Sequence, residues 1–121
     1  MLVKALRNGL GMIIVFVSWL TLPKQIKRSE VDQVQAQENT QGLALYQLYA
    51  CPFCVKTRRA IHRLNITLEI RDIGKQPSYR QELEQQGGRV KVPCLRIEEQ
   101  GEVRWMYESD DIIHFLNERF A

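Results

Sequence analysis

Two cysteines separated by a proline and a phenylalanine constrain this sequence more than any other feature. The motif Cys51-Pro52-Phe53-Cys54 follows residues 43–49 (LALYQLY), an apolar and aromatic run that predicts a buried strand. Pro52 suits the first position of a helix, because it has no N–H group for an intrahelical hydrogen bond. The motif therefore marks a junction at which a strand passes directly into a helix.

This junction has a chemical consequence for Cys51. The first N–H groups of a helix lack partners and form the positive end of the helix dipole, which stabilises a thiolate, the nucleophilic form of cysteine. Cys54 lies one helical turn further on, within reach of a mixed disulfide formed at Cys51. The sequence thus predicts a redox-active pair in which Cys51 attacks and Cys54 resolves the mixed disulfide.

Two other interpretations of the cysteine pair are less favoured. A structural zinc site needs two further ligands, and the remaining cysteine and histidines are Cys94, His62 and His114. Both histidines fall within helical patterns, so we expect no metal. Unreactive cysteines are typical of buried positions away from helix ends. A total of three cysteines also disfavours a secreted disulfide framework.

The segments around the motif predict a small α+β domain. In order, they indicate a strand at 43–49, a helix from Pro52, a strand at 66–70, a helix at 76–86, a hairpin of 94–97 with 103–106, and a helix from Ser109. We expect Ser109 to cap the last helix. A strand, helix and strand within thirty residues predict a parallel pair. The order β-α-β-α-β-β-α gives one sheet with helices on both sides.

Three motifs in this order resemble those of glutaredoxins. They are the Cys-Pro-Phe-Cys sequence, Val92-Pro93 before the hairpin, and Glu108-Ser109-Asp110 at the start of the last helix. The resemblance is closest to the subgroup similar to the N-terminal, thioredoxin-like domain of glutathione transferases, and it covers residues 43–120. It implies a glutaredoxin fold, with a four-stranded mixed sheet and helices on both faces, and glutathione as co-substrate.

The resemblance also implies roles for individual residues. Pro93 matches a cis-proline, and the preceding Val92 matches a residue that offers backbone hydrogen bonds to glutathione. Glu108 and Ser109 match the pair that holds the γ-glutamyl end. Phe53, which stands where most glutaredoxins have tyrosine, is grouped with these glutathione-binding residues. The candidates for the glycyl carboxylate are Lys91, Arg89 and Arg58.

Together these features predict a glutathione-dependent thiol–disulfide oxidoreductase that reduces protein–glutathione mixed disulfides or small disulfides. The alternative is a non-catalytic glutaredoxin-like module that binds partners at a membrane. An iron–sulfur carrier is disfavoured, because the resemblance implies glycine where Pro52 stands. Seventeen basic and fourteen acidic residues give a net charge of only +3, so no nucleic-acid partner is expected.

Residues 1–42 are expected to lie outside this domain. Residues 9–22 (GLGMIIVFVSWLTL) have no charge and are flanked by Lys4, Arg7 and Lys24. As a helix they would extend roughly 21 Å, against roughly 30 Å for a hydrocarbon core. No small-residue cleavage site follows closely. We therefore predict an uncleaved membrane anchor at 1–23, of undetermined depth and orientation, and a polar tether at 24–42.

A helix packed on the protein itself is the less favoured alternative for the apolar segment, because polar residues separate it from the domain. The compartment follows from the co-substrate. Glutathione is held at a reducing poise in the cytosol. The sequence therefore predicts that the domain at 43–121 faces the cytoplasm.

Overall fold

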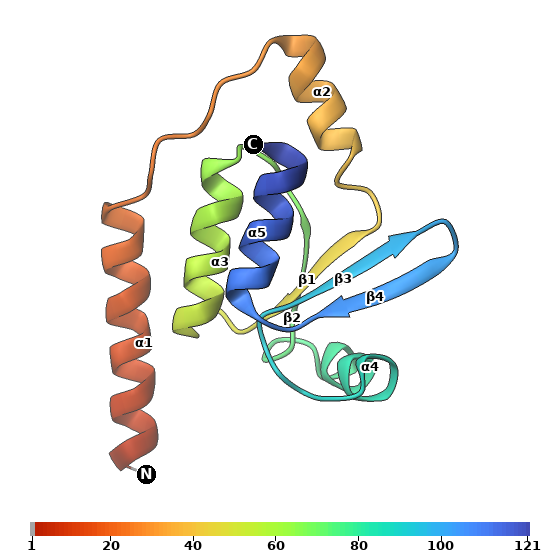
Figure 1. Ribbon diagram of the computed structural model, residues 1–121. Coiled ribbons are helices and arrows are strands. Elements are labelled where there is room, and N and C mark those ends of the chain that lie inside the picture. Colours follow the sequence, from red (N-terminus) through yellow and green to blue (C-terminus); the bar gives the residue numbers. More distant parts are fainter. Residues whose placement is uncertain (1) are drawn as a thin grey trace.

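Four strands form one mixed sheet in the order β2-β1-β3-β4 (Figure 1). The structure is a computed structural model that describes residues 2–121, with side chains from residue 9 onward; the side chains of Lys4 and Arg7, expected to flank the apolar segment, lie outside the described part. The elements are α1 (Leu2–Leu20), α2 (Glu30–Glu38), β1 (Leu43–Gln47), α3 (Pro52–Arg63), β2 (Glu69–Asp72), α4 (Pro77–Gly87), β3 (Cys94–Glu99), β4 (Glu102–Met106) and α5 (Ser109–Phe120).

Strand β1 is the centre of the sheet, and all five of its residues are buried. It pairs in parallel with β2 and antiparallel with β3, and β3 forms a hairpin with β4. The order β-α-β-α-β-β-α predicted for residues 43–121, its parallel pair and its hairpin are therefore confirmed. The apolar and aromatic composition of β1 suits a strand that is covered on both faces.

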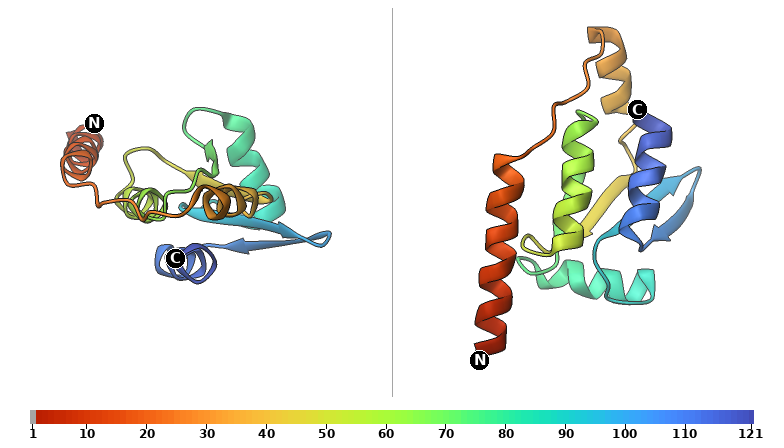
Figure 2. Two further views of the ribbon diagram at one scale, coloured as in Figure 1. Left: turned by 90° about the horizontal axis from the view of Figure 1, so that it is seen from above. Right: turned by 60° about the vertical axis from the view of Figure 1, so that its left-hand side comes forward.

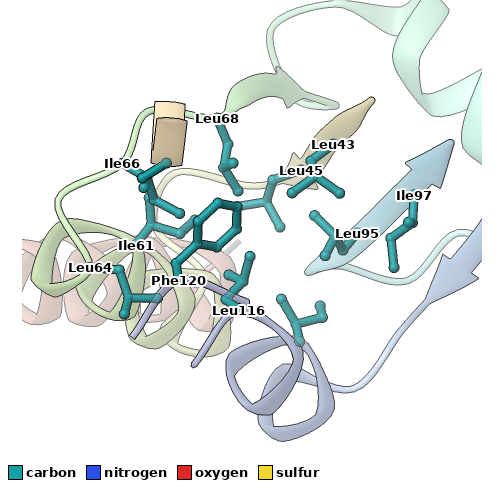
Figure 3. Close-up of a cluster of buried hydrophobic side chains, with 12 residues drawn as sticks. Leu43, Leu45, Ile61, Leu64, Ile66, Leu68, Leu95, Ile97, Leu116 and Phe120 are labelled. Carbon is teal, nitrogen blue, oxygen red and sulfur yellow. The ribbon is translucent and has the colours of Figure 1, made fainter. Parts of the chain in front are cut away.

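Alternate side chains of the central strands pack against helices on opposite faces of the sheet. One face of β1 and β3 packs against α3 and α5, in a cluster that includes Leu45, Leu95 and Leu116 (Figure 3). The other face packs against α4, where Tyr46 and Leu83 share a second cluster. Figure 2 shows α4 and α5 on opposite sides of the sheet. The expectation of a glutaredoxin-type fold with helices on both faces is confirmed.

The helix boundaries follow the predicted signals, with one correction. Pro52 and Pro77 begin α3 and α4, and Gly88 ends α4 with a left-handed backbone at φ 94°. At α5, however, the N-cap is Glu108, whose backbone is extended, and Ser109 is already helical. The prediction that Ser109 caps α5 was wrong by one residue, because the cap depends on backbone angles that Glu-Ser-Asp does not specify.

The second strand also differs in part from the prediction. Ile66 and Leu68 are buried as the alternation required, but the strand itself is Glu69–Asp72 and Ile70 is 41% exposed. Strand β2 is an edge strand, with β1 as its one neighbour in the sheet. An edge position of this kind leaves Ile70 partly exposed to solvent.

Residues 24–42 are attached to the domain and are more than the polar tether that the sequence suggested. Ser29 caps α2, as its sequence allows, and Ala36 is buried in the core cluster. Gln37 accepts a hydrogen bond from the Thr67 N–H (3.0 Å) and donates one to the Thr67 carbonyl (2.8 Å). The attachment uses polar side chains and one small residue, and hydropathy patterns do not reveal such contacts.

Helix α1 lies alongside α3, which corresponds to the less favoured prediction for the apolar segment (Figures 1 and 2). Gly11 allows the close approach, since a Cβ atom there would lie 2.7 Å from the carbonyl oxygen of Ala50. Within residues 2–121, no helix combines the length and apolar composition that a membrane crossing requires. Helix α1 nevertheless exposes large apolar side chains, among them Phe16 and Trp19.

Arg59 of α3 holds the C-terminal end of α1. Its guanidinium donates to the carbonyl oxygens of Ser18 and Thr21, both at 2.9 Å, and to both hydroxyls. We expect Arg59→Met to release this end, so that amides of residues 12–21 exchange hydrogen at least about tenfold faster, since hydrogen bonds to charged groups contribute about 1.5–3 kcal/mol. Hydrogen-exchange mass spectrometry measures this, with Lys56→Met as the control. Unchanged exchange in Arg59→Met would show that other contacts hold α1.

Candidate active site

Three connecting segments leave the sheet at the same end. Tyr46 near the end of β1 is opposite Cys94 at the start of β3, and Leu95 is opposite Met106 at the end of β4. The segments that continue from these strand ends are 48–51, 91–93 and 107–108. Each of them contains part of one of the three predicted motifs or leads directly into it, so the antiparallel register brings the three motifs to the same end of the sheet.

Cys51 is the N-cap residue of α3. Its backbone is extended, and its side chain makes no capping hydrogen bond to the first turn of the helix. The thiol is free and half-buried. The sulfur therefore lies at the positive end of the α3 dipole, and a thiolate there can accept N–H groups that the helix leaves without partners.

Cys54 is fully buried behind Cys51. Its sulfur accepts a hydrogen bond from the Leu48 N–H at 3.5 Å. Burial raises the pKa of Cys54 to about 12, and the neighbouring Cys51 adds to this rise. Cys54 is therefore a neutral thiol at physiological pH, adjacent to the half-buried sulfur of Cys51.

Cys94 lies on the α4 face of the sheet, in the cluster with Tyr46 and Leu83. Burial raises its pKa to about 12, although a hydrogen bond with Tyr107 opposes the rise. The thiol is fully buried. A buried free cysteine of this kind packs as a small hydrophobic residue.

The second predicted motif is next to the third. The Val92–Pro93 peptide bond is cis, as the resemblance implies. Lys91, immediately before it, donates to Glu108 at 2.8 Å, and this ion pair lowers the pKa of the Glu108 carboxyl. Ser109 is buried at the start of α5. Segment 91–93 and the N-terminus of α5 thus form one continuous surface.

The first and third motifs are also connected. Lys56 in the first two turns of α3 forms an ion pair with Asp110 in the first turn of α5. The N-termini of both helices therefore lie side by side. Phe53 is 61% exposed at this end and is free to contact a bound molecule. The predicted site residues therefore lie in these three segments or in the first turns of α3 and α5: Cys51, Phe53, Cys54, Val92, Pro93, Glu108 and Ser109.

The three basic residues predicted to bind the glycyl carboxylate of glutathione differ in what they contact. Arg58 donates to Gln47 Oε1 at 2.9 Å and to the Tyr49 carbonyl at 2.6 Å, so it supports the segment before Cys51. The Arg89 guanidinium stacks 4.4 Å from the centre of the Tyr107 ring. Lys91 is the one on the surface formed with Glu108. It is therefore the best placed of the three to contact a ligand there.

Tyr107 is a site residue that the sequence reasoning missed. Its hydroxyl lies 2.7 Å from the Gly87 carbonyl oxygen and 3.2 Å from that of Arg89. The residue precedes Glu108, and the carbonyls belong to the segment that leads to Val92. Tyr107 therefore positions two of the three motifs relative to each other. An aromatic residue before Glu-Ser was the one available signal, and it is equally typical of a strand end.

Among the side chains that the structure describes, no cluster of three or more histidine, cysteine, aspartate or glutamate residues is arranged to hold a metal ion. Cys94, for example, is buried in the cluster with Tyr46 and Leu83 on the α4 face of the sheet. The described site is thus one of thiols, backbone groups and ion pairs.

Comparison with known proteins gives a family match over most of the domain. Residues 45–121 match the family described as glutathione S-transferase, N-terminal domain. Two structures of maleylacetoacetate isomerase from Anaeromyxobacter dehalogenans 2CP-1 share the fold. The structure with glutathione bound in the active site has 22% sequence identity and a TM-score of 0.50, over 64% of this chain and 37% of that chain. The structure with bound dicarboxyethyl glutathione and citrate has 23% identity and a TM-score of 0.50, over 64% of this chain and 36% of that chain.

Wheat glutaredoxin is a further structural neighbour, with 20% identity and a TM-score of 0.49 over 76% of this chain and 87% of that chain. No match was found among curated proteins. The present chain spans little more than a third of the length of the isomerases. At these identities the likeness to solved structures establishes the thioredoxin-like fold.

Proposed function

The chain belongs to the family of glutathione S-transferase N-terminal domains, and on this premise we propose that it is a glutathione-dependent thiol–disulfide oxidoreductase. Its substrates are protein–glutathione mixed disulfides or small disulfides. The observation that supports this most directly is the contrast among the cysteines. Cys51 is half-buried at the N-terminus of α3, whereas Cys54 and Cys94 are fully buried.

The reaction follows from this arrangement. The Cys51 thiolate attacks the glutathione sulfur of a mixed disulfide, so that a new S–S bond forms as the old one breaks. The electron pair leaves with the substrate sulfur, which takes a proton from solvent. A second glutathione thiolate then attacks the Cys51 adduct and releases oxidised glutathione. Alternatively, Cys54 loses its proton and attacks Cys51, which releases glutathione and leaves an intramolecular disulfide.

Glutathione binding is proposed for the surface between segment 91–93 and the N-terminus of α5. The Val92 backbone can pair with the extended tripeptide as an added strand does. The start of α5 at Ser109 suits a carboxylate, because helix N-termini attract anions. Glu108 suits the ammonium group. Because the pKa of Glu108 is lowered, its carboxylate stays ionised at pH values below the usual pKa of a glutamate. The contact between Glu108 and the ammonium group therefore persists at mildly acidic pH.

The test is glutathione-coupled reduction of a glutathione mixed disulfide by the full chain. Oxidised glutathione is followed by coupling to glutathione reductase and NADPH oxidation. Steady turnover supports the proposal. Binding of glutathione by calorimetry without turnover would instead favour the non-catalytic binding module, and absence of both would contradict either function.

Two proposals concern location. The exposed apolar side chains of α1 support the first, that residues 9–22 contact a membrane. The second, that the domain faces the cytoplasm, follows from the proposed co-substrate, because glutathione is held at a reducing poise there. Membrane fractionation tests the first, and labelling of Cys51 in intact cells with a membrane-impermeant thiol reagent tests the second. Recovery of the chain in the supernatant would contradict the first proposal. Rapid labelling would contradict the second.

Tyr107→Phe is expected to weaken glutathione binding without impairing the chemical step. The variant loses hydrogen bonds to the Gly87 and Arg89 carbonyls, which align segment 91–93 with Glu108. One such bond contributes about 1 kcal/mol, so KM for glutathione should rise about fivefold while kcat stays within about twofold. Tyr79→Phe, which removes a hydroxyl from α4, is the matched control. A fall in kcat at unchanged KM would contradict a positioning role.

A further inference from the structure

A groove of about 420 Å³ runs between α1 and α3, beside the cysteine motif. The surface that its walls expose is mainly apolar, although Ser18, Thr21, Lys56 and Arg59 also contribute to them. Helix α1 contributes Ile13, Ile14 and Val17, and α3 contributes Pro52 and Val55. Ile13 is 59% exposed and Val17 is 50% exposed, so the groove is open to ligands from solvent. The motif chemistry described above makes no use of α1 or of this groove.

The groove begins next to the proposed nucleophile. Pro52 is the residue after Cys51 and forms part of the wall. On the other side of Cys51, Ala50 contacts Gly11 of α1. Helix α1 is thus packed against the chain immediately before the nucleophile, and the groove follows α3 away from it. A group attached to a sulfur that reacts at Cys51 is therefore close to the start of the groove.

The charges around the groove favour an uncharged occupant. Two cationic residues, Lys56 and Arg59, contribute to its walls. Lys56 is paired with Asp110, and the Arg59 guanidinium is engaged by the carbonyl and hydroxyl oxygens at the end of α1. Both cations are therefore partly compensated, which reduces their attraction for an anionic ligand. Burial of apolar surface is then the main interaction that the groove offers.

We propose that this groove binds an apolar substituent on the substrate sulfur, so that α1 sets the substrate preference of the enzyme. The inference rests on the proposed function and names the substrate class of the same site. When Cys51 attacks the glutathione sulfur of a disulfide G–S–S–R, the S–S bond to R breaks and RS⁻ leaves and is protonated by solvent. In an in-line attack the leaving sulfur is about two S–S bond lengths, roughly 4 Å, from the Cys51 sulfur. The R group attached to it lies within reach of the groove.

A membrane surface is the competing occupant, since α1 exposes apolar residues on its outer side as well. The two occupants require different residues. A substrate group contacts the groove wall, which includes Ile13 and Val17, whereas Phe16 is exposed but is not part of that wall and can contact only a membrane. Ile13 and Phe16 are matched in accessibility, because each is 59% exposed. Ile13 lines the groove and Phe16 does not, so substitutions at the two positions distinguish the occupants.

The experiment compares two glutathione mixed disulfides in the glutathione-coupled assay, one of 2-mercaptoethanol and one of benzyl mercaptan, with the full chain free of lipid and detergent. We expect kcat/KM to be at least about fivefold higher for the benzyl substrate, in line with the modest discrimination that apolar pockets achieve. Ile13→Asn should lower this preference at least about threefold, which exceeds ordinary scatter between variants. Phe16→Asn should leave it unchanged.

The outcomes separate the inference from the function on which it rests. Turnover of both substrates at similar kcat/KM overturns the groove proposal and leaves the oxidoreductase intact. A preference that Ile13→Asn and Phe16→Asn reduce equally also overturns it, since the preference then reflects the general apolarity of α1. Absence of turnover with both substrates contradicts the oxidoreductase and, with it, the groove proposal. Circular dichroism of each variant verifies that α1 remains helical.

Discussion

Replacement of Cys51 by serine is expected to abolish glutathione-dependent disulfide reduction, with a loss of at least about 10³-fold in kcat/KM. The serine hydroxyl is nearly isosteric with the thiol but stays protonated at neutral pH and does not form the mixed disulfide. Neither of the other cysteines can replace it, because both are fully buried and burial raises the pKa of each to about 12. The measurement is the glutathione-coupled assay on the full chain.

The control for this experiment is Cys54→Ser, which removes the buried thiol behind Cys51. Glutathione itself can resolve the adduct at Cys51, so this variant should retain at least about a third of the wild-type rate with glutathionylated substrates. A trapped Cys51 adduct, visible by mass spectrometry as an added glutathione, is expected when glutathione is omitted. Substantial activity in Cys51→Ser would contradict the assignment of the nucleophile.

The sequence was sufficient for the core of the fold because its signals are local and agree with one another. Pro52 and Pro77 sit at helix starts, Gly88 adopts the left-handed backbone that ends α4, and the apolar run around Leu45 forms the central strand. The three motifs lie close together because antiparallel pairing of β1, β3 and β4 brings three connecting segments to the same end of the sheet. The order of the short elements along the chain is enough to predict that these segments lie close together, and no side-chain contact needs to be known.

The N-terminal part was harder to predict, because the contacts that hold it use little apolar periodicity. Gly11 contributes by having no side chain, and Arg59 contributes through hydrogen bonds to the end of α1. Gln37 attaches α2 through an amide that pairs with the Thr67 backbone. An apolar helix with an exposed outer face gives the same hydropathy signal whether it packs on a protein or contacts a membrane. The role of Tyr107 was not predictable for a related reason, since it depends on hydrogen bonds to two carbonyls that are distant in sequence, those of Gly87 and Arg89.

Leu116→Ala is expected to lower the free energy of unfolding by about 2–5 kcal/mol. The Leu116 side chain is fully buried in the cluster that joins α5, α3 and the sheet (Figure 3). Its truncation removes transfer free energy and leaves a cavity, because a close-packed core relaxes only partly. The loss is a large fraction of the 5–15 kcal/mol typical of a small domain. Urea denaturation followed by circular dichroism measures it.

Two further substitutions on α5 test whether this loss comes from packing. Ile113→Ala removes a half-buried side chain from the same helix, so its cost should be less than half that of Leu116→Ala. Leu116→Met conserves volume and should cost less than about 1.5 kcal/mol. Equal costs for Leu116→Ala and Ile113→Ala would mean that α5 does not pack as described. Because α5 begins directly after Glu108, that result would also contradict the proposed glutathione site. A larger cost for Leu116→Ala than for Ile113→Ala supports the α5 packing that positions this site.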